Sequence, residues 1–180
     1  MKKLFTLFAA GALFALAFSF AAKAQRVNPQ IGVFYQKGQY SFEEAQVKDT
    51  FLGASFLVQF NIFYPESIYL TTGLEASLGL SKENNVPDYR IELPVRLSWM
   101  WEPTPRFAIG PFAGIYGAAN LMVTPDDKTL YNTLQGGYTA GASIQFGSFD
   151  LSGGYWRDFV PFHKGGSPFS GFRVSLNMFI

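Results

Sequence analysis

The 180-residue sequence has no cysteine and few charged residues, and each shortage excludes a class of protein. Without cysteine there is no disulfide framework, thiolate metal site, cysteine nucleophile or lipoprotein-type acylated cysteine. Charged residues make up 15% of the chain and the formal net charge is +1, so no basic field for nucleic acid exists. Apolar residues are abundant instead, 48% hydrophobic and 18% aromatic, which excludes intrinsic disorder and indicates one domain.

The first two dozen residues have the pattern of a secretory signal peptide. Two lysines precede an apolar run from Leu4 to Ala22, and the run ends in an Ala-x-Ala pattern that signal peptidase reads, closing at Ala24. An uncleaved membrane anchor is the alternative, because the run is near the minimum length that spans a bilayer. We expect a cleaved signal peptide at residues 1–24 and one domain at residues 25–180.

Beyond the signal peptide, glycines and prolines interrupt the apolar runs, so a membrane-bound chain would cross with strands. Apolar and polar residues alternate there with the period of two of a β-strand. Three strong and five weaker runs bring the number of expected strands to eight: 52–64, 68–80 and 89–101, then 30–36, 107–121, 134–147, 149–157 and 172–180. In 107–121 two phases compete, and we favour Ile109 and Ile115 facing outward over Phe112 and Tyr116.

The connections between these runs alternate in length. Short turns are expected at 65–67, 102–106 and 147–148, and longer polar loops at 37–50, 81–88, 122–132 and 158–168. This alternation is typical of a Gram-negative outer-membrane barrel. The predicted fold class is all-β: an eight-stranded antiparallel up-and-down transmembrane β-barrel that follows a cleaved signal peptide. An even strand number puts both termini at the short-turn end, which would face the periplasm.

The sequence of a soluble barrel would alternate in the same way. The residues on the polar side of each strand must therefore distinguish a soluble barrel from a membrane barrel. That side is rich in glycine and serine, as suits a narrow lumen, rather than in long charged side chains. The lysines beyond the signal peptide are expected in or at the edge of long loops, and none in a strand: Lys37, Lys48, Lys82, Lys128 and Lys164. This distribution favours the membrane barrel.

Aromatic residues gather near the expected strand ends, where the girdles of a membrane barrel lie. The predicted interface aromatics are Tyr64, Tyr89, Trp99, Trp101, Phe107, Phe146 and Phe149. Further aromatics near the long loops are expected in the same girdles: Tyr35, Phe51 and Phe169. A group where the seventh strand would leave the membrane could anchor the interface or contact a partner, and we favour the anchor: Trp156, Arg157, Phe159 and Phe162.

Three segments carry a resemblance to a known family: AIGPFAGIYG at 108–117, GGYTAGASIQFG at 136–147 and FDLSGGYWRDF at 149–159. With the alternating final strand, they resemble the eight-stranded PorT-like outer-membrane barrels of Bacteroidota, over essentially the whole chain after the signal peptide. The resemblance implies a fold and a place in the cell envelope, while the roles of the family vary. One departure is the C-terminus, where such barrels often end in an aromatic residue read by the assembly machinery: here Phe179 is penultimate and Ile180 is last.

The inward phase of the predicted strands collects three carboxylates and three arginines. An eight-stranded interior is just wide enough for side chains to fill, and unpaired buried charge is costly. We therefore predict an ionic network that fills the lumen, formed by Glu75, Arg90, Glu92, Arg96, Asp150 and Arg173. A narrow ion path, opened by rearrangement of this network, is the alternative.

An outer-membrane enzyme would need a nucleophile, a base and an orienting group within hydrogen-bond reach. The one histidine, His163, lies in the last long loop near Ser167 and Ser170, and we expect it to be solvated there. The acidic pairs at 43–44 and 126–127 lack the further ligands of a calcium loop. We predict no catalytic residue, no cofactor and no metal site, and a protein that is not an enzyme.

These features together predict an exported outer-membrane barrel with a structural or associative role: envelope integrity, adhesion, or docking to an envelope or secretion complex. A narrow pore for ions or small solutes is one alternative, and a lipid-modifying enzyme is another. The expected partners are outer-membrane lipid and lipopolysaccharide, the barrel-assembly machinery and an unidentified envelope protein, with no nucleic acid.

Overall fold

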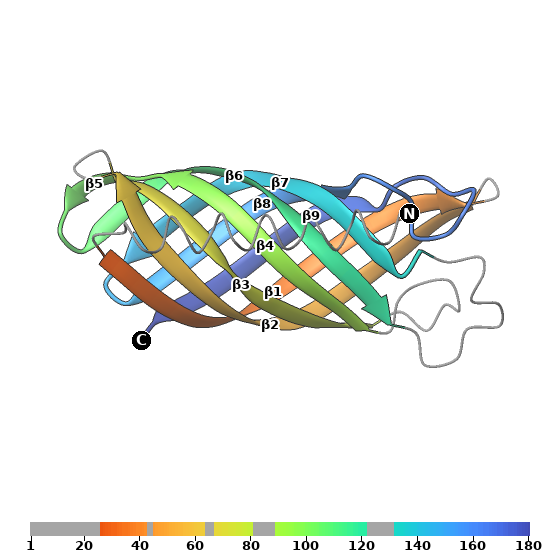
Figure 1. Cartoon of the computed structure of the whole chain (residues 1–180), viewed down its shortest axis with the longest axis horizontal. Coiled ribbons are helices and arrows are strands. Elements are labelled where there is room, and N and C mark those ends of the chain that lie inside the picture. The colour runs from red at the N-terminus through yellow and green to blue at the C-terminus, as the bar shows by residue number, and fades with distance from the viewer. Residues whose placement is uncertain (1–25, 43–44, 64–66, 81–88, 122–131) are drawn as a thin grey trace.

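The computed structural model describes residues 26–42, 45–63, 67–80, 89–121 and 132–180. Within these ranges the chain forms nine strands: β1 (Arg26–Phe42), β2 (Ala45–Phe63), β3 (Ile68–Gly79), β4 (Tyr89–Trp99), β5 (Trp101–Thr104), β6 (Phe107–Leu121), β7 (Leu134–Phe146), β8 (Phe149–Asp158) and β9 (Ser170–Phe179). They lie in the order β4-β3-β2-β1-β9-β8-β7-β6-β5, and pairing of β4 with β6 closes the sheet (Figure 1).

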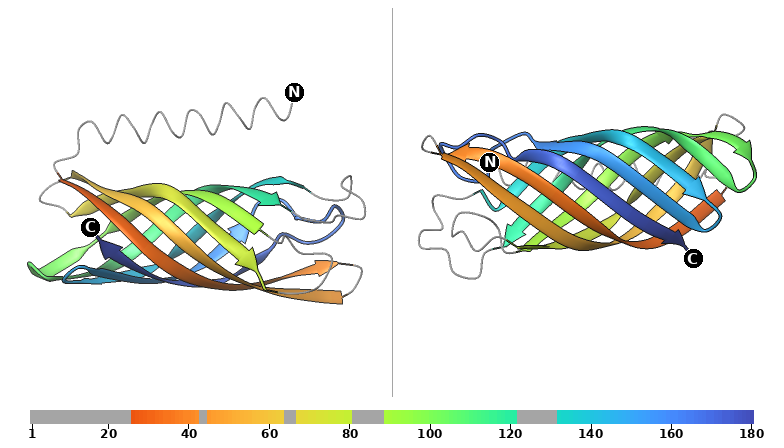
Figure 2. Two further views of the ribbon diagram at one scale, coloured as in Figure 1. Left: turned by 90° about the horizontal axis from the view of Figure 1, so that it is seen from below. Right: turned by 180° about the vertical axis from the view of Figure 1, so that it is seen from behind.

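The nine strands occupy eight positions in the wall. Only Met100 separates β4 from β5, and both pair with β6, so the two form one interrupted strand. Every pairing is antiparallel, and the strands wrap around the barrel with a common tilt (Figure 2). The predicted closed eight-stranded antiparallel barrel is thereby confirmed. The expected signal peptide at 1–24 lies outside the described residues, and within them no helix is long and apolar enough to cross a membrane.

The first and last strands lie side by side and share one end of the barrel. Gln30 on β1 pairs with Phe179 on β9. The Phe179 N–H donates to the Ser148 carbonyl at 2.8 Å, so β9 ends beside the short turn between β7 and β8. We call this end of the barrel the short-turn end, and the opposite one the long-loop end.

The β1–β2 hairpin is longer than predicted, and the expected loop at 37–50 was wrong. Lys37 pairs with Thr50, and the ladder continues until Phe42 lies opposite Ala45. The side chains there are polar, as in a loop, but inward and outward positions still alternate with a period of two. The backbone of the two strands stays paired along this segment. Lys37 and Lys48 therefore lie in strands, contrary to the prediction. The expected loop at 81–88 and most of that at 122–132 lie outside the described residues.

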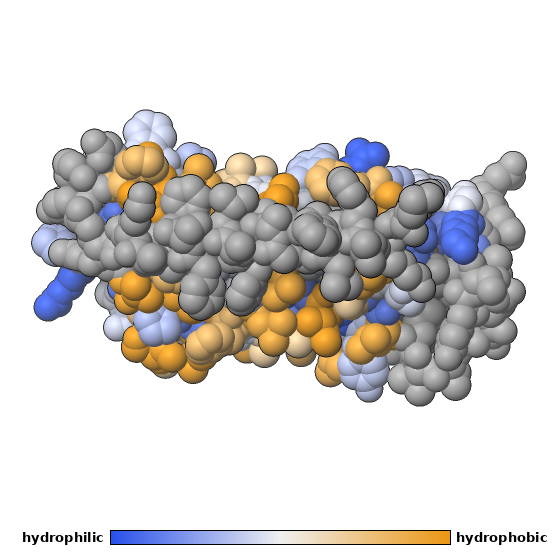
Figure 3. Space-filling model, viewed as in Figure 1, coloured by the Kyte–Doolittle hydropathy of each residue, from blue (hydrophilic) through white to orange (hydrophobic). Residues whose placement is uncertain are grey.

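The distribution of side chains is inverted relative to a water-soluble protein. Large apolar residues face outward, and many of them are visible along the wall between its two ends (Figure 3). The predicted phase of β6 is confirmed, because Ile115 is exposed while Phe112 and Tyr116 are buried. Two apolar clusters lie inside. One is near the long loops, and the other, formed by Tyr69, Met100 and Ala108, is at the short-turn end.

Candidate functional site

A continuous series of ion pairs crosses the lumen between β3, β4 and β9. Glu75 accepts from two arginines, with Oε1 2.6 Å from Arg96 Nη2 and Oε2 2.5 Å from Arg173 Nη1. Arg173 Nη2 lies 2.5 Å from Glu92 Oε2. Glu92 Oε1 in turn accepts from Arg90 Nε at 2.6 Å. Five of the six residues predicted to form the lumen network are thus joined directly.

The series ends at Asp158, a residue that sequence reasoning missed. Arg90 Nη2 lies 2.6 Å from Asp158 Oδ1, and the Tyr116 hydroxyl donates to the same oxygen at 2.6 Å. The expected strand stopped at residue 157, and Asp158 was assigned to the following loop. Continuing the period of two from Asp150 would have placed Asp158 inward, so the signal was present. The lumen series therefore holds three arginines and three carboxylates.

Asp150 stands apart from this series. Its Oδ2 accepts from Ser143 Oγ at 2.8 Å and from Gln145 Nε2 at 3.0 Å, and no ion pair to it is found among the described residues. Arg96 pairs with Glu75 instead. Asp150 and Arg96 both line a cavity of about 20 Å³, which is roughly the room for one water molecule.

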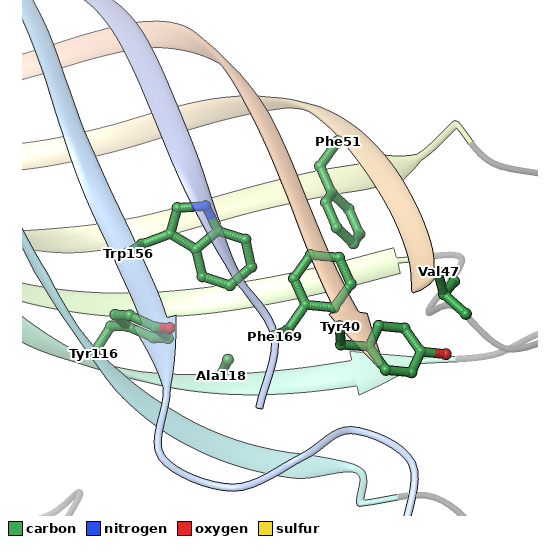
Figure 4. Close-up of a cluster of buried hydrophobic side chains, with 7 residues drawn as sticks. All are labelled: Tyr40, Val47, Phe51, Tyr116, Ala118, Trp156 and Phe169. Carbon is green, nitrogen blue, oxygen red and sulfur yellow. The ribbon is translucent and has the colours of Figure 1, made fainter. Parts of the chain in front are cut away.

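Aromatic rings fill the lumen between the ion pairs and the long-loop end (Figure 4). Trp156 stacks on Phe169 with ring centroids 5.2 Å apart. Phe169 also contacts Tyr40 and Phe51, at centroid distances of 5.4 and 5.9 Å. The Arg90 guanidinium lies 5.2 Å from the centre of the Trp156 ring, so the aromatic layer rests directly on the ionic one.

Four aromatics that the sequence suggested for the membrane interface lie inside the barrel. Phe51, Trp156, Phe162 and Phe169 are each only 1% exposed, so the girdle and anchor predictions were wrong for them. Phe51 and Trp156 fall in the inward phase of their strands. The other two lie in the connection between β8 and β9, which turns these two aromatic side chains inward.

The predicted interface aromatics behave differently. Those within the described residues are all exposed: Tyr89, Trp99, Trp101, Phe107, Phe146 and Phe149. Trp99 and Trp101 flank Met100 at the short-turn end, and the rings of Phe146 and Phe149 lie 5.7 Å apart at the same end. Tyr64 lies outside the described residues. Contact of these rings with a membrane interface stays a prediction.

His163 is buried, so the expectation of a solvated loop histidine was wrong. Its side chain is 5% exposed, and Nδ1 lies 2.9 Å from the Lys164 carbonyl oxygen. The connection that carries it is held against β1, where the Ser41 N–H donates to Ser167 Oγ at 2.7 Å and the Ser167 N–H donates to the Ser41 carbonyl at 2.8 Å. The acidic pairs at 43–44 and 126–127 lie outside the described residues.

A closed eight-stranded barrel with an apolar wall and a charged lumen has the architecture of small outer-membrane β-barrels. No family model and no curated protein matches the chain. Among solved structures the fold is similar to that of Neisserial surface protein A, with a TM-score of 0.53 and 9% identity over 87% of this chain and 100% of that one. The attachment invasion locus protein of Yersinia pestis aligns with a TM-score of 0.49 and 9% identity, over 86% of this chain and 97% of that one. The chain thus has the fold of an eight-stranded outer-membrane barrel.

Proposed function

We propose that this protein is an outer-membrane barrel with a structural or associative role rather than an enzymatic one. The inverted distribution of side chains carries the proposal: Glu75, in the lumen, is 1% exposed, whereas Trp101, on the wall, is 68% exposed. Exposed apolar surface of this extent is a liability in water and is favourable in a bilayer. The role we infer is that of a rigid, lipid-anchored element that supports the envelope, adheres to a surface or docks to an envelope complex.

The filled lumen favours this role over that of a pore. Ion pairs and stacked aromatic rings occupy successive levels of the interior, and a cavity of about 20 Å³ lies beside Asp150. The proposed orientation puts both termini in the periplasm and the long loops outside. Lipid, lipopolysaccharide, the barrel-assembly machinery and one envelope protein are the proposed partners. Membership of the PorT-like barrels is a prediction of the sequence resemblance.

The test is fractionation followed by affinity purification of the full chain, tagged after residue 24 so that the C-terminal strand stays intact. We expect the protein in the outer-membrane fraction, together with a partner that recurs between preparations and is absent from a second tagged barrel. Recovery in the soluble periplasmic fraction would contradict the membrane assignment. A change in lipid A detected by mass spectrometry after deletion of the gene would contradict the non-enzymatic role.

A further inference from the structure

The outward face of the barrel changes from apolar to cationic at one level near the long-loop end. On β1 the apolar positions end at Tyr35, and Lys37 is the next outward residue. On β8 Tyr155 is followed in the same phase by Arg157. Strand register aligns the two changes, because Lys37 pairs with Phe172 on β9, and Phe172 pairs with Tyr155 on β8.

A third cation lies on the strand next to β1. Lys48 on β2 pairs with Gln39 on β1, Gln39 pairs with Ser170 on β9, and Ser170 pairs with Arg157 on β8. One row of side chains therefore crosses four strands from Lys48 to Arg157, with Lys37 two residues from Gln39 in the same outward phase. Neighbouring strands are about 4.8 Å apart, which puts the Cα atoms of Lys37 and Arg157 about 12 Å apart. Their long side chains reach a common space.

The described part of this face carries no carboxylate. Asp49, Glu75, Glu92, Asp150 and Asp158 are buried inside the barrel. The remaining described carboxylate, that of Glu102, lies at the short-turn end, where it accepts from the Tyr69 hydroxyl at 2.5 Å. Lys37 and Arg157 thus place positive charge on the described outward surface near the long loops, directly beside an apolar wall. A ligand that matches both must join anionic groups to hydrocarbon.

Exposed aromatic rings border the cations. Tyr138, which pairs with Arg157, contacts the rings of Tyr155 and Phe159 at centroid distances of 6.4 and 6.0 Å. Tyr155 contacts Phe172 at 5.9 Å. Phe172 is 69% and Phe159 60% exposed, so these rings present their surfaces outward. Aromatic side chains of this kind lie where hydrocarbon meets head groups in a bilayer.

We propose that Lys37, Lys48 and Arg157 bind the phosphate groups of lipid A, the membrane anchor of lipopolysaccharide, in the outer leaflet. The inference rests on the proposed outer-membrane location and assigns a site to that lipid partner. Ammonium and guanidinium groups form strong charge-assisted hydrogen bonds to phosphate, and basic clusters beside apolar surface bind phosphorylated head groups. The aromatic rings pack against the sugars and the first methylenes of the acyl chains.

The test titrates the purified full barrel in phosphocholine micelles with bisphosphorylated lipid A, with dephosphorylated lipid A as the matched ligand. Each single change, Lys37→Gln or Arg157→Gln, is expected to raise Kd about fivefold. The double variant is expected to raise it about thirtyfold, or about 2 kcal/mol at roughly 1 kcal/mol per cation. Arg106→Gln, which removes an exposed cation at the short-turn end, should leave Kd within about twofold.

Folding of every variant is verified by its heat-dependent electrophoretic mobility, and Lys37→Arg with Arg157→Lys should retain binding because both charges remain. Equal affinity of the wild type for the two lipids would overturn the site. So would unchanged binding by the double variant, or equal competition by phosphatidylglycerol. Cell fractionation reads the location separately: wild-type protein in the periplasm would overturn the proposed function, whereas the micelle titration alone decides the lipid site.

Discussion

At the scale of single residues, Glu75 joins Arg96 to the rest of the lumen series. Its two oxygens accept from Arg96 and Arg173, which lie on β4 and β9. The carboxylate is shielded from water, and these two guanidinium groups balance its charge. Removing one member of a buried set leaves the others uncompensated, which costs far more free energy than the intact set contributes.

Replacing Glu75→Gln should lower the free energy of unfolding by about 3–5 kcal/mol, because two buried arginines lose their shared carboxylate. The measurement is urea-induced unfolding of the barrel refolded into lipid vesicles. Asp150→Asn is the matched control: an amide oxygen can still accept from Ser143 and Gln145, so a loss of about 1 kcal/mol or less is expected. Equal losses in the two variants would contradict an ionic role for Glu75.

The side of the strand on which each of these residues lies could be predicted from the sequence, but its ion-pair partner could not. Alternation alone places Glu75 and Arg96 in the lumen, because each side of a strand is decided by a local period of two. Which arginine meets which carboxylate depends on strand register and tilt around a closed barrel, which no local spacing encodes. Asp150 shows the consequence, since it lies in the predicted phase yet is satisfied by neutral donors rather than by an arginine.

At the scale of elements, the connection from β8 to β9 is held against the long-loop end of the barrel. Gln135 Nε2 donates to the Val160 carbonyl at 2.9 Å, and the Asn132 N–H donates to the Phe162 carbonyl at 2.8 Å. Phe162 and Phe169 are buried at its two halves. A loop has no side-chain period, so its polar composition suggested solvation and gave no sign of the inward aromatics. The long β1–β2 hairpin was missed for the related reason that polar residues alternate there.

Phe169→Ala should loosen this connection, because Phe169 packs on Trp156, Tyr40 and Phe51. Truncating a buried phenylalanine costs about 3–5 kcal/mol. We expect trypsin to cleave slowly after Lys164 in the wild-type barrel and at least several-fold faster in the variant, followed by mass spectrometry of the fragments. Phe159→Ala, an outward-facing phenylalanine of the same connection, should leave the cleavage rate near that of the wild type. Equal acceleration in both variants would contradict an inward anchor at Phe169.

At the scale of the whole molecule, layers of different chemistry fill the interior of the barrel. From the long loops inward, stacked aromatic rings come first, then the ion pairs of Glu75 and Glu92, then the small cavity beside Asp150. Tyr69, Met100 and Ala108 form the last layer at the short-turn end. An ion that crossed the lumen would have to displace both an aromatic stack and paired charges, so the closure does not depend on one contact.

The wild-type barrel should therefore show no steady conductance in planar bilayers at moderate voltage. Trp156→Ala combined with Phe169→Ala should also stay closed, because the ion pairs between Glu75, Arg173 and Glu92 still fill the level below the rings. A reconstituted porin in the same bilayers verifies that insertion and recording succeed. A stable open state of the wild type would contradict the filled lumen and favour the pore. Current in the double variant alone would instead assign the seal to the aromatic layer, and the ion pairs would then serve stability rather than closure.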